Sequence, residues 1–234
     1  KLGKLKKLKN FKIYNKISKI NLNKKNTNYL IENEIKNSLK LLNVNQFEGI
    51  FLHNPEDLLS KKGELIYDFL IEQKNNKLIK KIGISVYTIK ETQKLLDYYD
   101  FDIIQIPVNI FFQDFIESDF LKFLKSKQLK IFARSIFLQG LLLMDKKPKK
   151  FNRFKKHFNK YDNFLEFNHI SRLQACIEFI KTIKEIDYYI FGFESLNQFK
   201  KILHFFLTQE KKYEWKDFQV KNSKLTNPIN WKSF

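Results

Sequence analysis

The chain has 234 residues, of which 43% are hydrophobic, and this is enough for one folded domain with a sizeable core. The single cysteine, Cys176, excludes an internal disulfide and a cysteine-built zinc site, and no apolar run reaches the ~18 residues of a membrane-spanning helix. The formal net charge is +19, and the excess is local, because residues 1–30 and 146–160 contain basic groups and no acidic ones. Because no apolar secretory segment is visible at the N-terminus, the sequence predicts a cytoplasmic protein.

Short apolar runs alternate with helical patterns along the whole chain. We expect strands at 11–16, 47–53, 80–87, 101–106, 129–134 and 187–193. We expect helices at 28–42, 57–73, 114–126 and 163–184, and a further one that begins near Ser195. After the third strand, Thr88 and Glu91 have the spacing of a capping box, which predicts a helix start there.

Six strands, each followed by a helix, indicate parallel strands joined by right-handed crossovers. An open doubly wound sheet and a closed (β/α) barrel both fit this order. The chain has no GxGxxG and no Walker sequence, which argues against a Rossmann or P-loop nucleotide site. We expect residues 1–234 to form a single domain, with 208–234 as a C-terminal tail that packs on its outside.

The basic segment 146–160 has two interpretations. Lysines interleaved with aromatic residues are typical of surfaces that bind RNA or another polyanion. However, Phe151, Phe154 and Phe158 have amphipathic helix spacing, which favours phenylalanines in a core and lysines on a solvated face.

Polar residues lie at or just after the ends of the predicted strands. These are Lys16, His53, Ser85, Gln105, the pair Arg134–Ser135, and the stretch from Gly192 to Ser195. Each position alone is more often structural than functional. In a βα barrel, however, the carboxyl ends of the strands meet on one face, where sites are built. The repeated placement therefore predicts one site.

Several stretches resemble the aldo-keto reductase family, in particular its bacterial branch related to aryl-alcohol dehydrogenases. The matching stretches are YNKIS, SLKLLNVNQFEGIFLHNPEDLL, KKIGISVYTIKE, FDIIQIPVNIFFQ, IFARSIFLQGLLLMD, IFGFESLNQF and LTNPINW. The resemblance implies a parallel (β/α)8 TIM barrel that binds NADPH or NADH without a Rossmann motif. It also implies hydride transfer between the nicotinamide and a carbonyl or alcohol, in the intact protein perhaps on a sugar or sugar nucleotide, with no membrane or nucleic-acid partner.

The resemblance carries site roles to particular residues. Lys16 and His53 match the family's catalytic lysine and histidine. Cofactor contacts fall on Ser85 and Gln105 for the carboxamide, on Ser135, Leu138 and Gly140 for the pyrophosphate, and on Gly192, Ser195 and Gln198 for the adenosine phosphate. Arg134 stands where many members have an aromatic residue stacked on the nicotinamide, and a guanidinium can also stack. No metal is implied.

The chain also departs from the family pattern. The family's catalytic Asp and Tyr belong to the first two βα units, and Tyr14 does not occupy the place of the catalytic tyrosine. We therefore expect a fragment with six of the eight strands that is inactive by itself. Val86 takes the second position of the family's usual Ser-Asn pair, so one amide contact is lost. Ile202 stands where an Asn often contacts adenine. Glu194 stands where NADPH-preferring members often have Arg, which favours NADH. The alternative is a decayed, non-catalytic barrel that binds a polyanion such as RNA through its basic segments.

Overall fold

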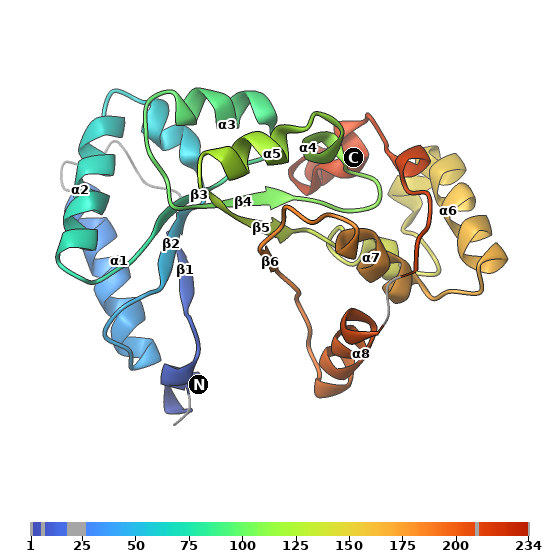
Figure 1. Ribbon diagram of the computed structural model, residues 1–234, viewed down its shortest axis with the longest axis horizontal. Helices are drawn as coiled ribbons and strands as arrows, with labels where there is room; N and C mark the ends of the chain where they lie inside the picture. The colour runs from blue at the N-terminus through green and yellow to red at the C-terminus, as the bar shows by residue number, and fades with distance from the viewer. Residues whose placement is uncertain (1, 6–7, 18–26, 209–210, 234) are drawn as a thin grey trace. The chain divides into compact units, whose positions relative to one another are not determined.

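The computed structural model describes residues 2–5, 8–17, 27–208 and 211–233. Its strands are β1 (Tyr14–Ile17), β2 (Gly49–Leu52), β3 (Ile82–Ser85), β4 (Ile103–Pro107), β5 (Lys130–Arg134) and β6 (Tyr188–Tyr189). They lie in one sheet in the order in which they occur along the chain (Figure 1). The pairs from β1 to β4 are parallel, which confirms the parallel α/β class.

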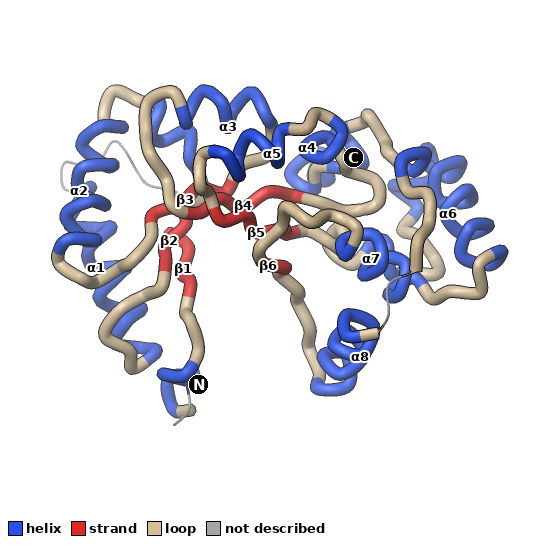
Figure 2. The backbone as a smooth tube through the Cα atoms, viewed as in Figure 1, coloured by secondary structure: helices blue, strands red, loops and turns tan. Residues whose placement is uncertain are grey.

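Helices connect the strands and cover the sheet (Figure 2). They are α1 (Thr27–Leu42), α2 (Gly63–Asn75), α3 (Ile89–Leu96), α4 (Asp114–Glu117), α5 (Phe120–Ser126), α6 (Lys155–Phe167), α7 (Arg172–Lys181), α8 (Leu196–Leu207) and α9 (Ser223–Thr226). The predicted cap is present, because Thr88 Oγ1 accepts a hydrogen bond from the Glu91 amide at the start of α3. No helix in the described ranges is both long and apolar enough to cross a membrane.

Four predicted elements differ from the structure. The helix expected over 57–73 begins only at Gly63, after a 3-10 segment at Pro55–Leu59. The helix expected over 163–184 is two helices, because His169 has a φ of 51° and Ser171 starts α7 with a side-chain cap. The helix expected over 114–126 is also divided, into α4 and α5, where Asp119 has a φ of 54°. The last strand is limited to Tyr188–Tyr189, although the apolar run extends over 187–193.

The described chain forms two compact units. The first consists of residues 1–106 and 123–132, and the second of residues 107–122 and 133–234. The first unit contains β1 to β4. The face of these strands that carries Lys16, Phe51 and Gly83 is closely packed. In register, Lys16 pairs with Phe51 and Phe51 pairs with Gly83. A Cβ atom on Gly83 would lie 2.3 Å from Ile103 Cγ1, so only hydrogen fits at this position.

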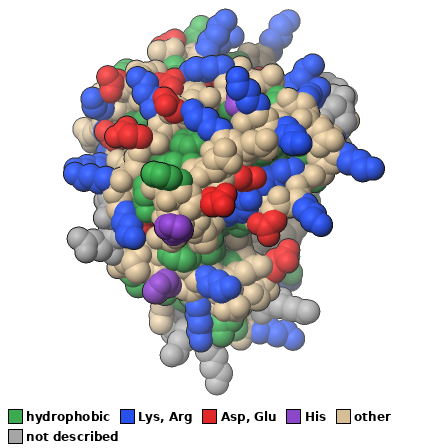
Figure 3. All heavy atoms as spheres, turned by 90° about the vertical axis from the view of Figure 1, so that its right-hand side faces the viewer, with side chains coloured by type: hydrophobic (Ala, Val, Ile, Leu, Met, Phe, Trp, Pro, Cys, Tyr) green, Lys and Arg blue, Asp and Glu red, His purple; other side chains and the backbone are tan. Residues whose placement is uncertain are grey.

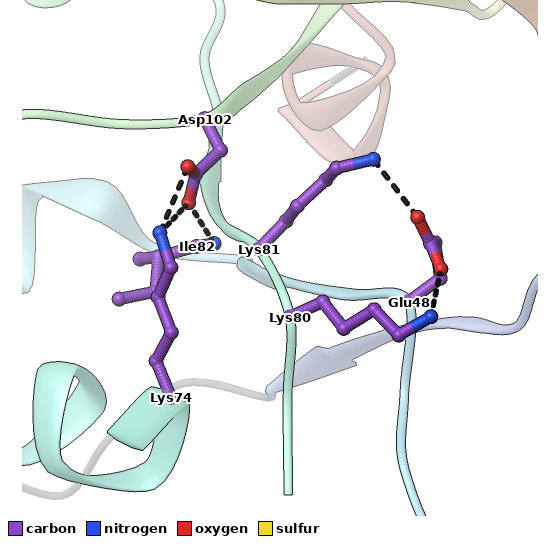
Figure 4. Close-up of polar contacts among 6 residues, drawn as sticks. All are labelled: Glu48, Lys74, Lys80, Lys81, Ile82 and Asp102. Carbon is purple, nitrogen blue, oxygen red and sulfur yellow. Dashed lines mark hydrogen bonds and ion pairs between the residues drawn. The ribbon is translucent and has the colours of Figure 1, made fainter. Parts of the chain in front are cut away.

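The amino ends of the strands carry ion pairs (Figure 4). Glu48, just before β2, binds Lys80 and Lys81 at 3.1 and 2.9 Å. The hydrogen bond from Lys81 lowers the pKa of Glu48 below its ordinary value. Asp102, just before β4, accepts from Lys74 Nζ at 2.7 Å and from the Ile82 amide at 2.8 Å. The pairs of Glu48 connect the starts of β2 and β3, and the pair of Asp102 connects the start of β4 with α2. We assign these interactions to stability.

The core of the second unit is aromatic. Phe151, Phe154 and Phe158 are buried, as expected when such residues recur at helical spacing. The C-terminal residues pack onto this core, where the Trp215 ring lies 5.2 Å from the Phe164 ring and Trp231 lies 4.9 Å from Phe151. Hydrophobic contacts therefore hold the described part of the tail against α6 and the segment before it.

Candidate functional site

A polar cluster lies toward the carboxyl ends of β1, β3 and β4, with Ser85 and Gln105 buried and Lys16 partly buried. Lys16 Nζ donates to Ser85 Oγ at 3.1 Å and to Gln105 Oε1 at 2.5 Å. Ser85 also donates to Gln105 Oε1, at 3.3 Å. Ser85 and Gln105 are 2% and 6% exposed and pair directly in the parallel register. Three residues from distant parts of the sequence thus form one hydrogen-bonded group in the first unit.

The strand geometry explains why these side chains meet. Alternate residues of a strand point to the same face, and parallel strands bring their carboxyl ends to the same edge of a sheet. Lys16 is next to last in β1, and its long side chain reaches Ser85, the last residue of β3, and Gln105, the middle residue of β4. The lysine therefore contributes a positive charge to the edge where polar side chains gather.

His53 lies at this same edge. It directly follows Leu52, which pairs with Ile84, so its position in register falls beside Ser85. The His53 amide donates to the Ile17 carbonyl at 3.0 Å, which continues the pairing of β1 with β2 beyond the strand ends. The imidazole is exposed. By strand alternation, His53 belongs to the face that carries Phe51 and hence Lys16.

A second group of predicted residues forms the loop after β5 in the second unit. Arg134 Nη1 donates to Ser135 Oγ at 3.1 Å. The backbone of this loop is left-handed at Ser135, Leu138 and Gly140, whose φ angles are 60°, 47° and 82°. Leu138 is fully buried, so its side chain anchors the loop while its backbone turns.

A third group lies at the start of α8, also in the second unit. Ser195 Oγ accepts from the Gln198 amide at 3.2 Å, and Gln198 Oε1 accepts from the Glu194 amide at 2.7 Å. Both polar side chains therefore cap the helix, and the role predicted for them at the cofactor remains a prediction. Gly192 is exposed, and a Cβ atom built there would meet nothing within 4 Å.

Two buried amides were not singled out from the sequence. Asn109 is 1% exposed and Gln113 is 5% exposed, and both follow β4 in the stretch IPVNIFFQ. Each bonds to backbone atoms of its own turn and to one backbone carbonyl far along the chain, that of Ser135 for Asn109 and that of Trp215 for Gln113. The only local signal was two amide residues in an otherwise apolar segment.

The basic segment 146–160 does not expose its phenylalanine rings, on which the bases of a nucleic acid could stack. Its phenylalanines are buried, and Lys150 and Arg153 lie over the rings of Phe151 and Phe154 at 5.4 and 5.0 Å from the ring centres. Figure 3 shows Lys and Arg side chains scattered over this side of the molecule, with acidic side chains among them. No group of three or more His, Cys, Asp or Glu side chains arranged to hold a metal occurs in the described part of the chain.

A parallel α/β fold with polar side chains gathered toward the carboxyl ends of its strands is the arrangement found in enzymes built on βα barrels. The sequence profile of the Aldo/keto reductase family matches residues 2–222. The chain therefore belongs to the aldo/keto reductase family, and this supports a general oxidoreductase function. A comparison with curated proteins gave no significant match.

Solved structures share the fold. Aldo-keto reductase AKR11C1 from Bacillus halodurans, in its apo form, has a TM-score of 0.75 at 14% identity and covers 93% of this chain and 74% of its own. An aldo/keto reductase from Klebsiella pneumoniae in complex with NADP and acetate has a TM-score of 0.64 at 15% identity. The match covers 94% of this chain and 71% of the Klebsiella chain. The glycerol dehydrogenase AKR11B4 from Gluconobacter oxydans has a TM-score of 0.52 at 18% identity. The match covers 80% of this chain and 67% of the Gluconobacter chain.

Proposed function

We propose that the protein is an NAD(P)H-dependent reductase of carbonyl compounds, built on a (β/α)8 barrel of which this chain supplies six strands. The observation that carries the proposal is the hydrogen-bonded group of Lys16, Ser85 and Gln105 at the carboxyl strand ends of an aldo/keto reductase. Reduction of a carbonyl builds negative charge on its oxygen, so a site for it needs a cation and a proton donor.

The residues present fit a nicotinamide cofactor. Ser85 and Gln105 are buried groups that donate and accept hydrogen bonds, which suits a carboxamide. Arg134 would stack on the nicotinamide, and the left-handed loop from Ser135 to Gly140 would hold the pyrophosphate. Gly192, Ser195 and Gln198 would lie toward the adenosine phosphate. The cofactor supplies the hydride, and the protein supplies position and charge.

Lys16 and His53 have distinct proposed roles. The Lys16 ammonium stabilises negative charge on the reacting oxygen and favours ionisation of a nearby tyrosine donor. The His53 imidazole donates a hydrogen bond that orients the carbonyl. The family's Asp and Tyr have no match in these 234 residues, so we propose that this chain does not turn over alone. A sugar or sugar nucleotide is the first substrate class to test.

Cofactor choice depends on the start of α8. Glu194 is exposed and directly precedes the Ser195 cap, so its carboxylate would repel the 2′-phosphate of NADPH. Ile202 is buried in the helix and offers no hydrogen bond to adenine. Both residues support a preference for NADH.

The proposal is tested by titrating NADH and NADPH into the chain and following nicotinamide fluorescence. We expect binding, with NADH tighter, and a loss of about tenfold or more in affinity for Lys16→Met, because its charge-assisted hydrogen bonds position Ser85 and Gln105. The matched control is Lys12→Met, an exposed lysine near the same strand. Absence of binding to either dinucleotide, or equal losses for the two variants, would contradict the proposal.

A further inference from the structure

Asn109 joins two loops of the second unit through both ends of its buried side chain. Its Oδ1 accepts from the amides of Phe111 and Phe112, each at 3.1 Å. Its Nδ2 donates to the Ser135 carbonyl at 3.2 Å. The first contacts close the turn after β4, and the last one reaches the loop after β5. The side chain is 1% exposed, so these contacts are shielded from water.

The loop from Ser135 to Gly140 needs such support. Four of its six residues have positive φ, and three of these are not glycine: Ser135, Leu138 and Gln139. Each non-glycine residue in this region costs about 1 kcal/mol or more. The Ser135 carbonyl accepts from the Leu138 amide at 2.8 Å within the loop, and the Asn109 contact is its second hydrogen bond.

The turn after β4 is itself bonded to the C-terminal tail. Gln113 Nε2 donates to the Ile110 carbonyl at 2.8 Å and to the Trp215 carbonyl at 2.9 Å. The Val220 amide donates to the Phe111 carbonyl at 3.0 Å. Residues 215–220 therefore hold the turn, and the turn holds the loop through Asn109.

We propose that Asn109 is a positioning residue that fixes the left-handed loop 135–140, and that tail residues 215–220 support it through Gln113. The link of this loop to a cofactor rests on the proposed function. The positioning itself does not, because it involves contacts within the second unit only.

Two substitutions separate the roles of the Asn109 side chain. Asn109→Asp keeps the oxygen that accepts from Phe111 and Phe112 but lacks the amide that donates to Ser135. Asn109→Ala loses both. Amide hydrogen exchange of the full chain should become about threefold to tenfold faster at Leu138, Leu141 and Leu142 in both variants. At Phe111 and Phe112 it should become faster only in the Ala variant.

Gln113→Leu removes the hydrogen bond between the turn after β4 and the tail, and so tests whether the tail supports the loop. It also replaces the Asn109 variants as the test if those do not fold. It should accelerate exchange in loop 135–140 although Asn109 is intact. The matched control is Asn168→Ala, which removes an Nδ2 bond to the Phe164 carbonyl in the same unit and should leave the loop unchanged. Loop exchange that is unchanged in the variants that fold overturns the positioning role.

Dinucleotide titration of the same variants separates this inference from the proposed function. If the loop holds a cofactor, Asn109→Asp and Gln113→Leu should weaken NADH binding about threefold to tenfold, and Asn168→Ala should not. If exchange accelerates while the unaltered protein binds no dinucleotide, the positioning role stands and the cofactor role of the loop fails.

Discussion

Burial determines the pKa of the Cys176 thiol. It is 1% exposed in α7, and burial raises its pKa to about 12, although Tyr161 Oη lies 3.7 Å from its sulfur. The folded protein thus keeps a proton that the unfolded chain releases near pH 8.5. The stabilising contribution is complete below that pH and is lost as the pH rises toward about 12.

We therefore expect the free energy of unfolding to fall between pH 8 and pH 10 more steeply in the unaltered protein than in Cys176→Ala. The thiol contributes a slope of at most about 1.4 kcal/mol per pH unit. Urea denaturation at the two pH values measures it. Equal slopes in the two proteins would show that the thiol titrates normally in the folded state.

Single residues also show which parts of the site the sequence can predict. Lys16, Ser85 and Gln105 were expected together because each lies at or near the carboxyl end of a predicted strand, and parallel sheets place these ends side by side. Asn109 followed no such rule. Its partner Ser135 lies 26 residues further along the chain and accepts through a backbone carbonyl, which leaves no mark on residue type.

The cap of α8 is the element for which a structural role competes with a binding role. Ser195→Ala removes the acceptor for the Gln198 amide and should cost about 1 kcal/mol of stability. Thr88→Ala removes the equivalent cap of α3 and should cost a similar amount. Urea denaturation and NADH titration of both variants separate the roles. Weaker NADH binding in Ser195→Ala alone would support a phosphate contact, and unaltered stability would contradict the cap.

The packing of β3 against β4 makes a second prediction at this scale. Gly83→Ala should destabilise the protein by about 2 kcal/mol or more, because the new Cβ atom would lie 2.4 Å from the Ile103 carbonyl oxygen, a backbone atom. Gly192→Ala is the matched control, since its Cβ atom meets nothing within 4 Å. Thermal unfolding of both variants gives the comparison, and similar melting temperatures would contradict the close approach of the two strands.

The elements themselves were predicted better in type than in extent. The periodicity of apolar residues located all six strands and most helices, because it reports which side faces a core. It failed over 163–184, where the apolar spacing continues past a break in the backbone. The signal for the break was present in Ser171 and Gln174, which have the spacing of a helix start and cap α7 in the structure.

At the scale of the whole molecule, the net charge of +19 raises the alternative of polyanion binding. Charge alone attracts nucleic acid weakly and in a salt-dependent way. Proteins that bind single strands also have exposed aromatic rings on which the bases of the nucleic acid stack. Here Phe151, Phe154 and Phe158 are buried, so the basic segment offers charge without exposed rings. We therefore expect only weak binding of RNA, which increasing salt abolishes.

Fluorescence anisotropy of a labelled single-stranded RNA at about 50 and 200 mM salt tests this expectation. Replacing Lys149, Lys150 and Arg153 by Ala should lower the salt slope by at most about 2, since each phosphate contact contributes about 0.7. The matched control replaces three exposed lysines of the first unit, Lys61, Lys90 and Lys94, and should lower affinity by a similar amount if the attraction is unspecific. Tight binding at 200 mM salt that only the first triple substitution removes would favour the polyanion function, because net charge alone treats both sets of cations alike.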